Sequence, residues 1–356
     1  MNKLVYSAIA LTAVSASAFA TDNGWVSLDQ EINNLNASLS AQNASGPKVG
    51  GYVRSRWESS SDVQVADDFN AENHDLSGFS IDNVRLEVSG DAGSDYAYKV
   101  SFDLAGGSAS LKDAYVKFKI GDSVMGKMGQ FKANFLHSST VGDDKLVLLD
   151  RTILGAIPTW NSRDAGVELA FSYDTINLTV SGQNGTDAAG KEYELVAKVS
   201  ANLMGGGIGK VEGAYGAGDA TALTAGISYL NDSNVDKSST IGVEALMTSG
   251  PFSLAGEVVI FDKNGVGDVT GGTPATYFAD ATPWDITGSY LFSDMWEGAV
   301  RFEDLDDVDN STLMTVGVNY FVSGHDIKWT AQYQKFTTDN ASGDVSIVGL
   351  GLSLTL

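Results

Sequence analysis

The sequence contains no cysteine, and it is short of basic residues. Without cysteine, neither disulfide bonds nor thiolate metal sites can form. Only 22 lysines and arginines stand against 45 acidic residues, which gives a net charge of −23. Because no basic excess is available to displace counterions, nucleic acid is not expected as a partner. Beyond the N-terminus no apolar run reaches about 18 residues, which excludes a helical membrane protein.

What the sequence does contain is a series of segments in which apolar and polar residues alternate. Four of them follow one another between residues 79 and 131 with short polar turns between them, as in a β-meander. In one segment Val116 and Phe118 share a face, whereas Lys117 and Lys119 share the other. A charged row that recurs on every strand is typical of a water-filled lumen, and the apolar face is then expected to meet lipid.

The chain of 356 residues is long enough for one barrel of about sixteen strands, at roughly 20 residues per strand and turn. We therefore predict an all-β fold, a transmembrane antiparallel β-barrel formed by residues 48–356. An apolar run and the small-residue site Ala18-Phe19-Ala20 indicate a signal peptide at residues 1–20. Such a signal before barrel strands predicts the outer membrane of a Gram-negative bacterium.

Residues 21–47 contain the only predicted helix, a short periplasmic one. Within it Leu28, Ile32, Leu35 and Leu39 repeat at a 4-3-4 spacing. A helix this short is not stable alone, so a partner must cover its apolar stripe. We favour a coiled coil that joins copies of the chain, most simply three, because the stripe is narrow. The alternative is a helix that folds against its own barrel or plugs it.

Two connecting segments must be assigned either as a loop or as a strand. The polar segment Ser59–Ser77 is predicted to be an external loop after the first strand, Val49–Glu58. Eleven further alternating segments, read between residues 165 and 356, complete a count of sixteen. Residues 205–220 have moderate β character, but a seventeenth strand would place the two termini at opposite ends of the barrel. We therefore predict no strand there.

The residues predicted to face the lumen on the first five strands include more cations than anions. They are Arg54, Arg56, Glu58, Arg85, Glu87, Lys99, Asp103, Asp113, Lys117, Lys119 and Lys127. A positive wall inside an acidic protein would act collectively on passing ions. The alternative is that these charges only pair with one another across strands in a solvated lumen.

The longest mixed segment, Lys132–Ser162, carries its own apolar residues. A loop of this size is expected to fold onto another part of the molecule, and the barrel interior is the available place. Its charged residues are predicted to form a constriction opposite the basic wall: Lys132, Asp143, Asp144, Lys145, Asp150 and Arg151.

Several stretches resemble the phosphate-selective porin O and P family. The similarity is carried by residues 78–91 (GFSIDNVRLEVSGD), 98–107 (YKVSFDLAGG), 111–116 (LKDAYV), 128–132 (MGQFK), 150–152 (DRT), 296–306 (WEGAVRFEDLD) and 315–321 (TVGVNYF). This resemblance implies a sixteen-stranded trimeric porin whose third external loop folds inward. In the family, phosphate selectivity resides in a ladder of arginines and a lysine cluster. Here the loop's cations are interleaved with Asp143, Asp144, Asp150 and Asp164.

The predicted function is a porin, a water-filled channel for passive diffusion of small hydrophilic solutes and ions. Its expected partners are outer-membrane lipid, the solutes and further copies of the chain. The alternatives are an anion- or phosphate-selective channel that uses the basic wall, and a closed structural or adhesive barrel. No cofactor or metal is expected, since the acidic loop 304–309 lacks the spacing of a calcium-binding loop.

An enzyme is not expected, because the three histidines, His74, His137 and His325, lie in no catalytic motif. The six tryptophans lie mostly near predicted strand ends, as in an interfacial belt.

Overall fold

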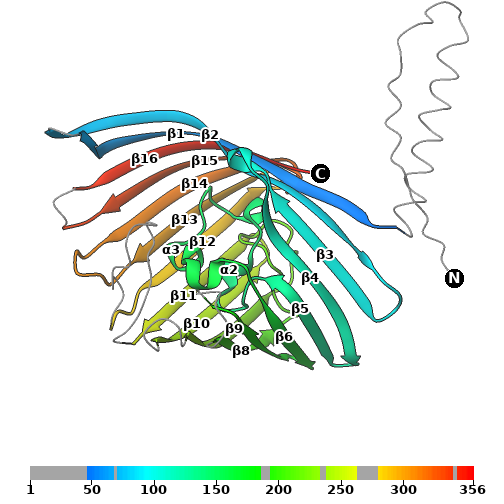
Figure 1. Ribbon diagram of the computed structural model, residues 1–356. Coiled ribbons are helices and arrows are strands. Elements are labelled where there is room, and N and C mark those ends of the chain that lie inside the picture. The colour runs from blue at the N-terminus through cyan, green and yellow to red at the C-terminus, as the bar shows by residue number, and fades with distance from the viewer. Residues whose placement is uncertain (1–45, 68–69, 186–192, 233–237, 263–279, 340–342) are drawn as a thin grey trace, which may run out of the picture. The chain divides into compact units, whose positions relative to one another are not determined.

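The computed structural model describes residues 46–67, 70–185, 193–232, 238–262, 280–339 and 343–356. The predicted signal peptide and nearly all of the predicted helical segment lie outside these residues. The described strands form one closed antiparallel barrel in which each strand pairs with its neighbours in sequence. The ring closes where β1 (Lys48–Asp67) pairs with β16 (Val345–Thr355), with Tyr52 opposite Thr355 (Figure 1). Closure leaves no unpaired strand edge in the membrane.

The other strands are β2 (Asn70–Asp91), β3 (Tyr96–Asp103), β4 (Ser110–Gly121), β5 (Val124–Phe131), β6 (Asp164–Tyr173), β7 (Ile176–Gln183), β8 (Glu194–Met204), β9 (Ala222–Asp232), β10 (Ser238–Ser249), β11 (Phe252–Phe261), β12 (Trp284–Ser293), β13 (Trp296–Asp304), β14 (Thr312–Ser323) and β15 (Ile327–Thr337). The short helices are η1 (Ala105–Gly107), α2 (His137–Thr140), η2 (Asp143–Lys145), α3 (Ile153–Ala156) and α4 (Pro158–Asn161). None of the described helices has both the length and the apolar character needed to cross a bilayer.

The predicted distribution of side chains between the two faces of the wall is confirmed. Val116, Val243 and Val300 point outward and expose 43%, 41% and 52% of their surface. On the inward face of the same strands, Glu244 and Arg301 expose only 5% and 2%. Exposed apolar residues recur on strand after strand, which is the pattern expected of a lipid-facing surface.

The prediction of a loop at residues 59–77 was wrong. β1 and β2 continue as a paired hairpin, in which Asp67 is opposite Asn70 and only residues 68–69 lie between the strands. A strand needs about 9–11 residues to cross the membrane, so this hairpin extends well beyond it. Outside the membrane no lipid imposes an apolar face on a strand, so the sequence there gives little sign of one.

The two ends of the barrel differ in their connections. At one end, here called the turn end, most connections are only two to four residues long, as at residues 122–123 between β4 and β5. The exception is 205–221, which contains no strand, as predicted. At the opposite end, the loop end, residues 132–163 form the longest connection whose residues are all described; they carry α2, η2, α3 and α4 (Figure 1).

Trp160 does not belong to an interfacial belt. Its side chain is fully buried, with ring centroids 4.5 Å from Phe135 and 6.1 Å from Phe261. By contrast, Trp284, Trp296 and Trp329 are outward and exposed. A tryptophan in a loop that folds inward cannot be told from a belt residue by its place near a strand end.

The outward orientation of Val243, in the middle of β10, predicts a large effect of charge. Val243→Lys should lower the free energy of unfolding by about 2–4 kcal/mol, since a lysine near the bilayer midplane is solvated poorly. Urea unfolding in lipid vesicles measures it, with Val243→Leu as the uncharged control. Equal stability of the two variants would contradict the assigned faces.

Candidate functional site

The β5–β6 loop, residues 132–163, packs inside the barrel through its apolar residues. Phe135, Leu136, Leu154, Ile157 and Trp160 are buried in one cluster. That cluster also contains inward-facing residues of three strands, namely Val196 on β8, Leu230 on β9, and Val259 and Phe261 on β11. The apolar residues that set this loop apart in the sequence therefore bind it to the inner wall.

The loop is also held by a row of carboxylates. Glu244, Glu257, Asp285 and Glu303 stand directly opposite one another on neighbouring strands β10 to β13. Three of them accept hydrogen bonds from loop amides: His137 N donates to Glu244 at 2.7 Å, Ser138 N to Glu257 at 2.9 Å and Ile153 N to Glu303 at 2.6 Å.

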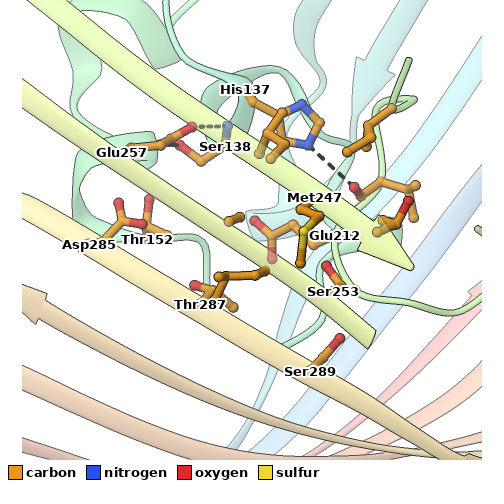
Figure 2. A pocket seen from close by; sticks show the side chains of 17 residues that line it. His137, Ser138, Thr152, Glu212, Met247, Ser253, Glu257, Asp285, Thr287 and Ser289 are labelled. Carbon is orange, nitrogen blue, oxygen red and sulfur yellow. Dashed lines mark hydrogen bonds between the residues drawn. The ribbon is translucent and has the colours of Figure 1, made fainter. Parts of the chain in front are cut away.

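Adjacent like charges repel, so this row needs compensation. Lys198 Nζ supplies part of it at 2.7 Å from Glu244 Oε1. The Ser138 hydroxyl also donates to Glu257, next to the amide bond that Figure 2 shows, and a small cavity lies beside this contact. Asp285 lines the same cavity, and its Oδ2 has no hydrogen-bond partner among the described residues. The loop amides and Lys198 thus provide partners for acidic side chains that would otherwise be unfavourable in the wall.

The middle of the loop crosses to the strands near the barrel closure. Leu149 N donates to Gln332 Oε1 at 2.9 Å, and Asn319 Nδ2 donates to the Val147 carbonyl at 2.7 Å. Arg54 Nη2 donates to the Leu149 carbonyl at 2.5 Å. Backbone groups that would be unpaired inside the barrel are therefore bonded to β14, β15 and β1.

Glycines on the inward face of β16 make room for this part of the loop. A Cβ on Gly349 would lie 2.7 Å from Leu149 Cδ1, and a Cβ on Gly351 would also collide with the Leu149 side chain. The absence of side chains at these two positions lets the loop lie directly on the wall.

Two cavities remain beside the loop. The turn-end cavity has a volume of about 890 Å³ and reaches Leu356 and His325. The loop-end cavity has a volume of about 390 Å³ and reaches Ser110 and Lys112. Both are lined by strands β2 to β5, on the side of the barrel that the loop leaves open.

Four residues line both cavities, and we call them the junction: Arg85, Lys132, Asp143 and Arg163. Three of the four are basic residues. The turn-end cavity as a whole is lined by nine lysine and arginine side chains and by five acidic ones. A chain with a net charge of −23 thus carries a locally positive surface along these cavities.

The guanidinium groups at the junction are already engaged with carboxylates. Arg85 Nη2 lies 3.3 Å from Asp103 Oδ2 and 3.9 Å from Asp143 Oδ2. Arg163 Nε lies 3.3 Å from Asp113 Oδ1. Cations and anions therefore alternate across the junction.

The protonation of two junction residues follows from their surroundings. Burial opposes ionisation of Asp143, but Arg151, Arg54 and Lys132 outweigh it and hold its pKa well below the usual range. Burial, and then the charges of Arg151 and Arg163, lower the pKa of Lys132 to about 6. Lys132 Nζ donates to the Ser139 carbonyl at 2.8 Å and to Asn161 Oδ1.

The predicted lumen residues fall into three groups. Those that line the turn-end cavity are Arg85, Glu87, Lys99, Asp113, Lys117 and Lys127, and the loop-end cavity is lined by Asp103 as well as Arg85. Arg54 and Arg56 instead contact the loop, and Arg56 Nη1 lies 2.7 Å from Asp150 and 2.8 Å from Glu58. Lys119 is exposed near the turn end, 2.8 Å from Asp122.

The predicted constriction residues are also divided. Those that line the turn-end cavity are Lys132, Asp143, Asp144, Lys145 and Arg151. Asp150 instead lies between Arg56 and Gln332 Nε2, the latter at 3.1 Å. Arg163 and Lys210 line the turn-end cavity but were not among the predicted site residues. In the sequence these two residues can be recognised only as charged residues within long connections between strands.

Solved outer-membrane proteins share this fold at low sequence identity. The channel DcaP of Acinetobacter baumannii is 15% identical, with a TM-score of 0.57, and the match covers 87% of this chain and 97% of that one. OmpT of Vibrio cholerae is 14% identical, with a TM-score of 0.57 and the same two coverages. The anion-selective porin from Comamonas acidovorans is 10% identical, with a TM-score of 0.58, covering 87% and 99%.

No curated protein matches the chain in sequence. The family described as phosphate-selective porin O and P, however, matches residues 53–354. This range runs from β1 to β16 and so includes both cavities and the loop between the strands. The chain belongs to the phosphate-selective porin O and P family and is a porin of the Gram-negative outer membrane.

Proposed function

We propose that the β5–β6 loop narrows the channel at the junction, and that small hydrophilic solutes pass there with a preference for anions. The observation that carries this proposal is the meeting of the two cavities at Arg85, Lys132 and Arg163. Short turns of bacterial barrels lie in the periplasm, so the turn end faces the periplasm and the β5–β6 loop is the third external loop.

The preference for anions should be modest. A guanidinium binds phosphate tightly when its planar fork is free to take two oxygens. Here Arg85 is paired with Asp103, Arg163 with Asp113, and Arg151 lies 2.6 Å from Asp143. An anion must compete with these carboxylates, so it is attracted to the junction without being held, as conduction requires.

We propose a passive channel rather than an enzyme. His137 Nε2 lies 3.3 Å from the Val211 carbonyl, beneath the loop, and the His325 ring packs against Tyr215 and Phe321. Neither histidine is placed between a serine and a carboxylate in the manner of a nucleophilic triad.

We further propose that three copies assemble through the helical stripe in residues 21–47. Deleting residues 26–42 should abolish a coiled-coil contact while leaving the barrel folded, since the barrel's strands begin at Lys48. Chemical cross-linking in outer-membrane vesicles compares the intact and shortened chains. An unchanged trimer band would show that the stripe has another role.

Neutralising two junction cations should reduce the preference for anions. At pH 5, where Lys132 is charged, we expect the double variant Lys132→Gln/Arg163→Gln to lower the chloride-to-potassium permeability ratio about three-fold or more, because the local field falls with the charge. The reversal potential in a KCl gradient across a planar bilayer measures this ratio.

The matched control is Lys335→Gln. It removes one positive charge from a residue that lies 3.2 Å from Asp344, in neither cavity. A wild-type channel that prefers potassium, a double variant with an unchanged ratio, or a protein without stepwise currents would contradict the proposal.

The low pKa of Lys132 predicts a dependence on pH. Lysine is charged below its pKa, so lowering the pH from about 8 to 5 should charge Lys132 and raise the chloride-to-potassium ratio around pH 6. Asp143, whose pKa is held low, stays ionised throughout this range. In Lys132→Met the change around pH 6 should be absent, and its persistence there would show that another group titrates.

A further inference from the structure

The connection between β8 and β9, residues 205–221, is unusual for the turn end of the barrel. The other turn-end connections are two to four residues long, whereas this one is long enough to reach across the lumen. It is rich in glycine, and Gly213 has a φ of +88°, which a side chain rarely adopts. A Cβ at Gly213 would also lie 2.6 Å from Glu297 Oε1. The backbone of this turn therefore approaches the opposite wall closely.

The turn is bonded both to the far wall and to the β5–β6 loop. Ala214 N donates to Glu297 Oε1 on β13 at 2.6 Å, and the Tyr215 ring stacks on Phe321 of β14 at 3.8 Å between centroids. Since β13 and β14 lie several strands away from β8 and β9 in the ring, the turn reaches into the lumen.

Glu212 is the residue that joins the two inserted segments. Its carboxylate accepts a bond from Val147 N at 3.2 Å and lies 3.0 Å from Arg301 Nη2 on β13. Its own amide donates to the Lys145 carbonyl at 3.1 Å. Both charged side chains are buried, with exposed fractions of 8% and 2%. Such a pair is costly to break, so the turn is held in one place.

Because Glu212 is anchored, the position of Lys210, two residues earlier in the chain, is fixed as well. Lys210 is the only residue of the turn that lines the turn-end cavity, where it joins Lys117 of β4 and Lys127 of β5. Burial within the lumen, and then the charge of Lys127, lower its pKa. Among the described residues neither Lys117 nor Lys210 has an ion-pair partner, in contrast to the paired arginines of the junction.

We propose that residues 205–221 form a second constriction element, inserted from the turn end, which holds Lys210 in the path of permeating anions. Glu212 is its positioning residue. This inference rests on the proposed ion path beside the loop. It adds a specificity-determining cation that belongs to no barrel strand and to no external loop.

Charge at position 210 can be changed in the intact porin because the chain has no cysteine. Lys210→Cys should lower the chloride-to-potassium permeability ratio about two-fold or more in planar bilayers. An aminoethyl thiosulfonate reagent, which restores a positive charge, should return the ratio toward the wild-type value. A sulfonatoethyl reagent, which adds a negative charge, should lower it further.

Two controls make the result specific. Lys335→Cys, treated with the same reagents, should change the ratio little, because Lys335 lies at the loop end beside Asp344. In a Glu212→Ala background the effect of charge at position 210 should shrink if Glu212 positions Lys210. A merely structural role of Glu212 would change the conductance but leave the dependence on that charge intact.

The outcomes separate this inference from the proposed function. If the ratio is the same for all three charges at position 210 while the Lys132→Gln/Arg163→Gln variant still changes it, the second constriction is contradicted and the junction stands. If the wild-type channel prefers cations but still responds to charge at position 210, the anion preference is contradicted and the inserted turn stands.

Discussion

Buried carboxylates that accept hydrogen bonds from loop amides are the constraint on which the lumen depends. A loop cannot lie inside a barrel unless its backbone groups find partners. Glu244, Glu257 and Glu303 supply acceptors along one row of the wall, while Arg54 and Asn319 supply donors farther round. The loop amides in turn stabilise these acidic side chains, because neighbouring carboxylates repel one another. Loop and wall thus stabilise each other.

This mutual dependence sets the shape of the channel. The β5–β6 loop enters from one end and the β8–β9 turn from the other, and Glu212 bonds to both the loop and β13. Together they pack against strands from β8 round to β16 and leave cavities whose main walls are β2 to β5. The cations of that wall, few in an acidic protein, are therefore concentrated where water remains. Local placement, rather than net charge, decides what an ion meets.

The sequence was sufficient for the barrel, its strand number and the faces of its strands, because a wall between lipid and water imposes strict alternation on Val116, Lys117 and their neighbours. It failed where that constraint is relaxed. The part of the β1–β2 hairpin outside the membrane lacks a clear alternation of apolar and polar residues. Nothing in the sequence around Trp160 indicates that its loop folds into the barrel. Arg54 and Lys99 occupy equivalent positions in the alternating pattern of their strands. Arg54 nevertheless anchors the loop, whereas Lys99 lines a cavity, and only the tertiary fold decides this difference.

The most direct test of the account is amide hydrogen exchange in the membrane-reconstituted porin. The amides of His137, Ser138, Leu149 and Ile153 are each bonded to a side chain of the inner wall. The account predicts that they exchange as slowly as the amides of the barrel strands that hold them. Exchange at the rate of an open, solvated loop would contradict the insertion of this segment and the channel route that follows from it.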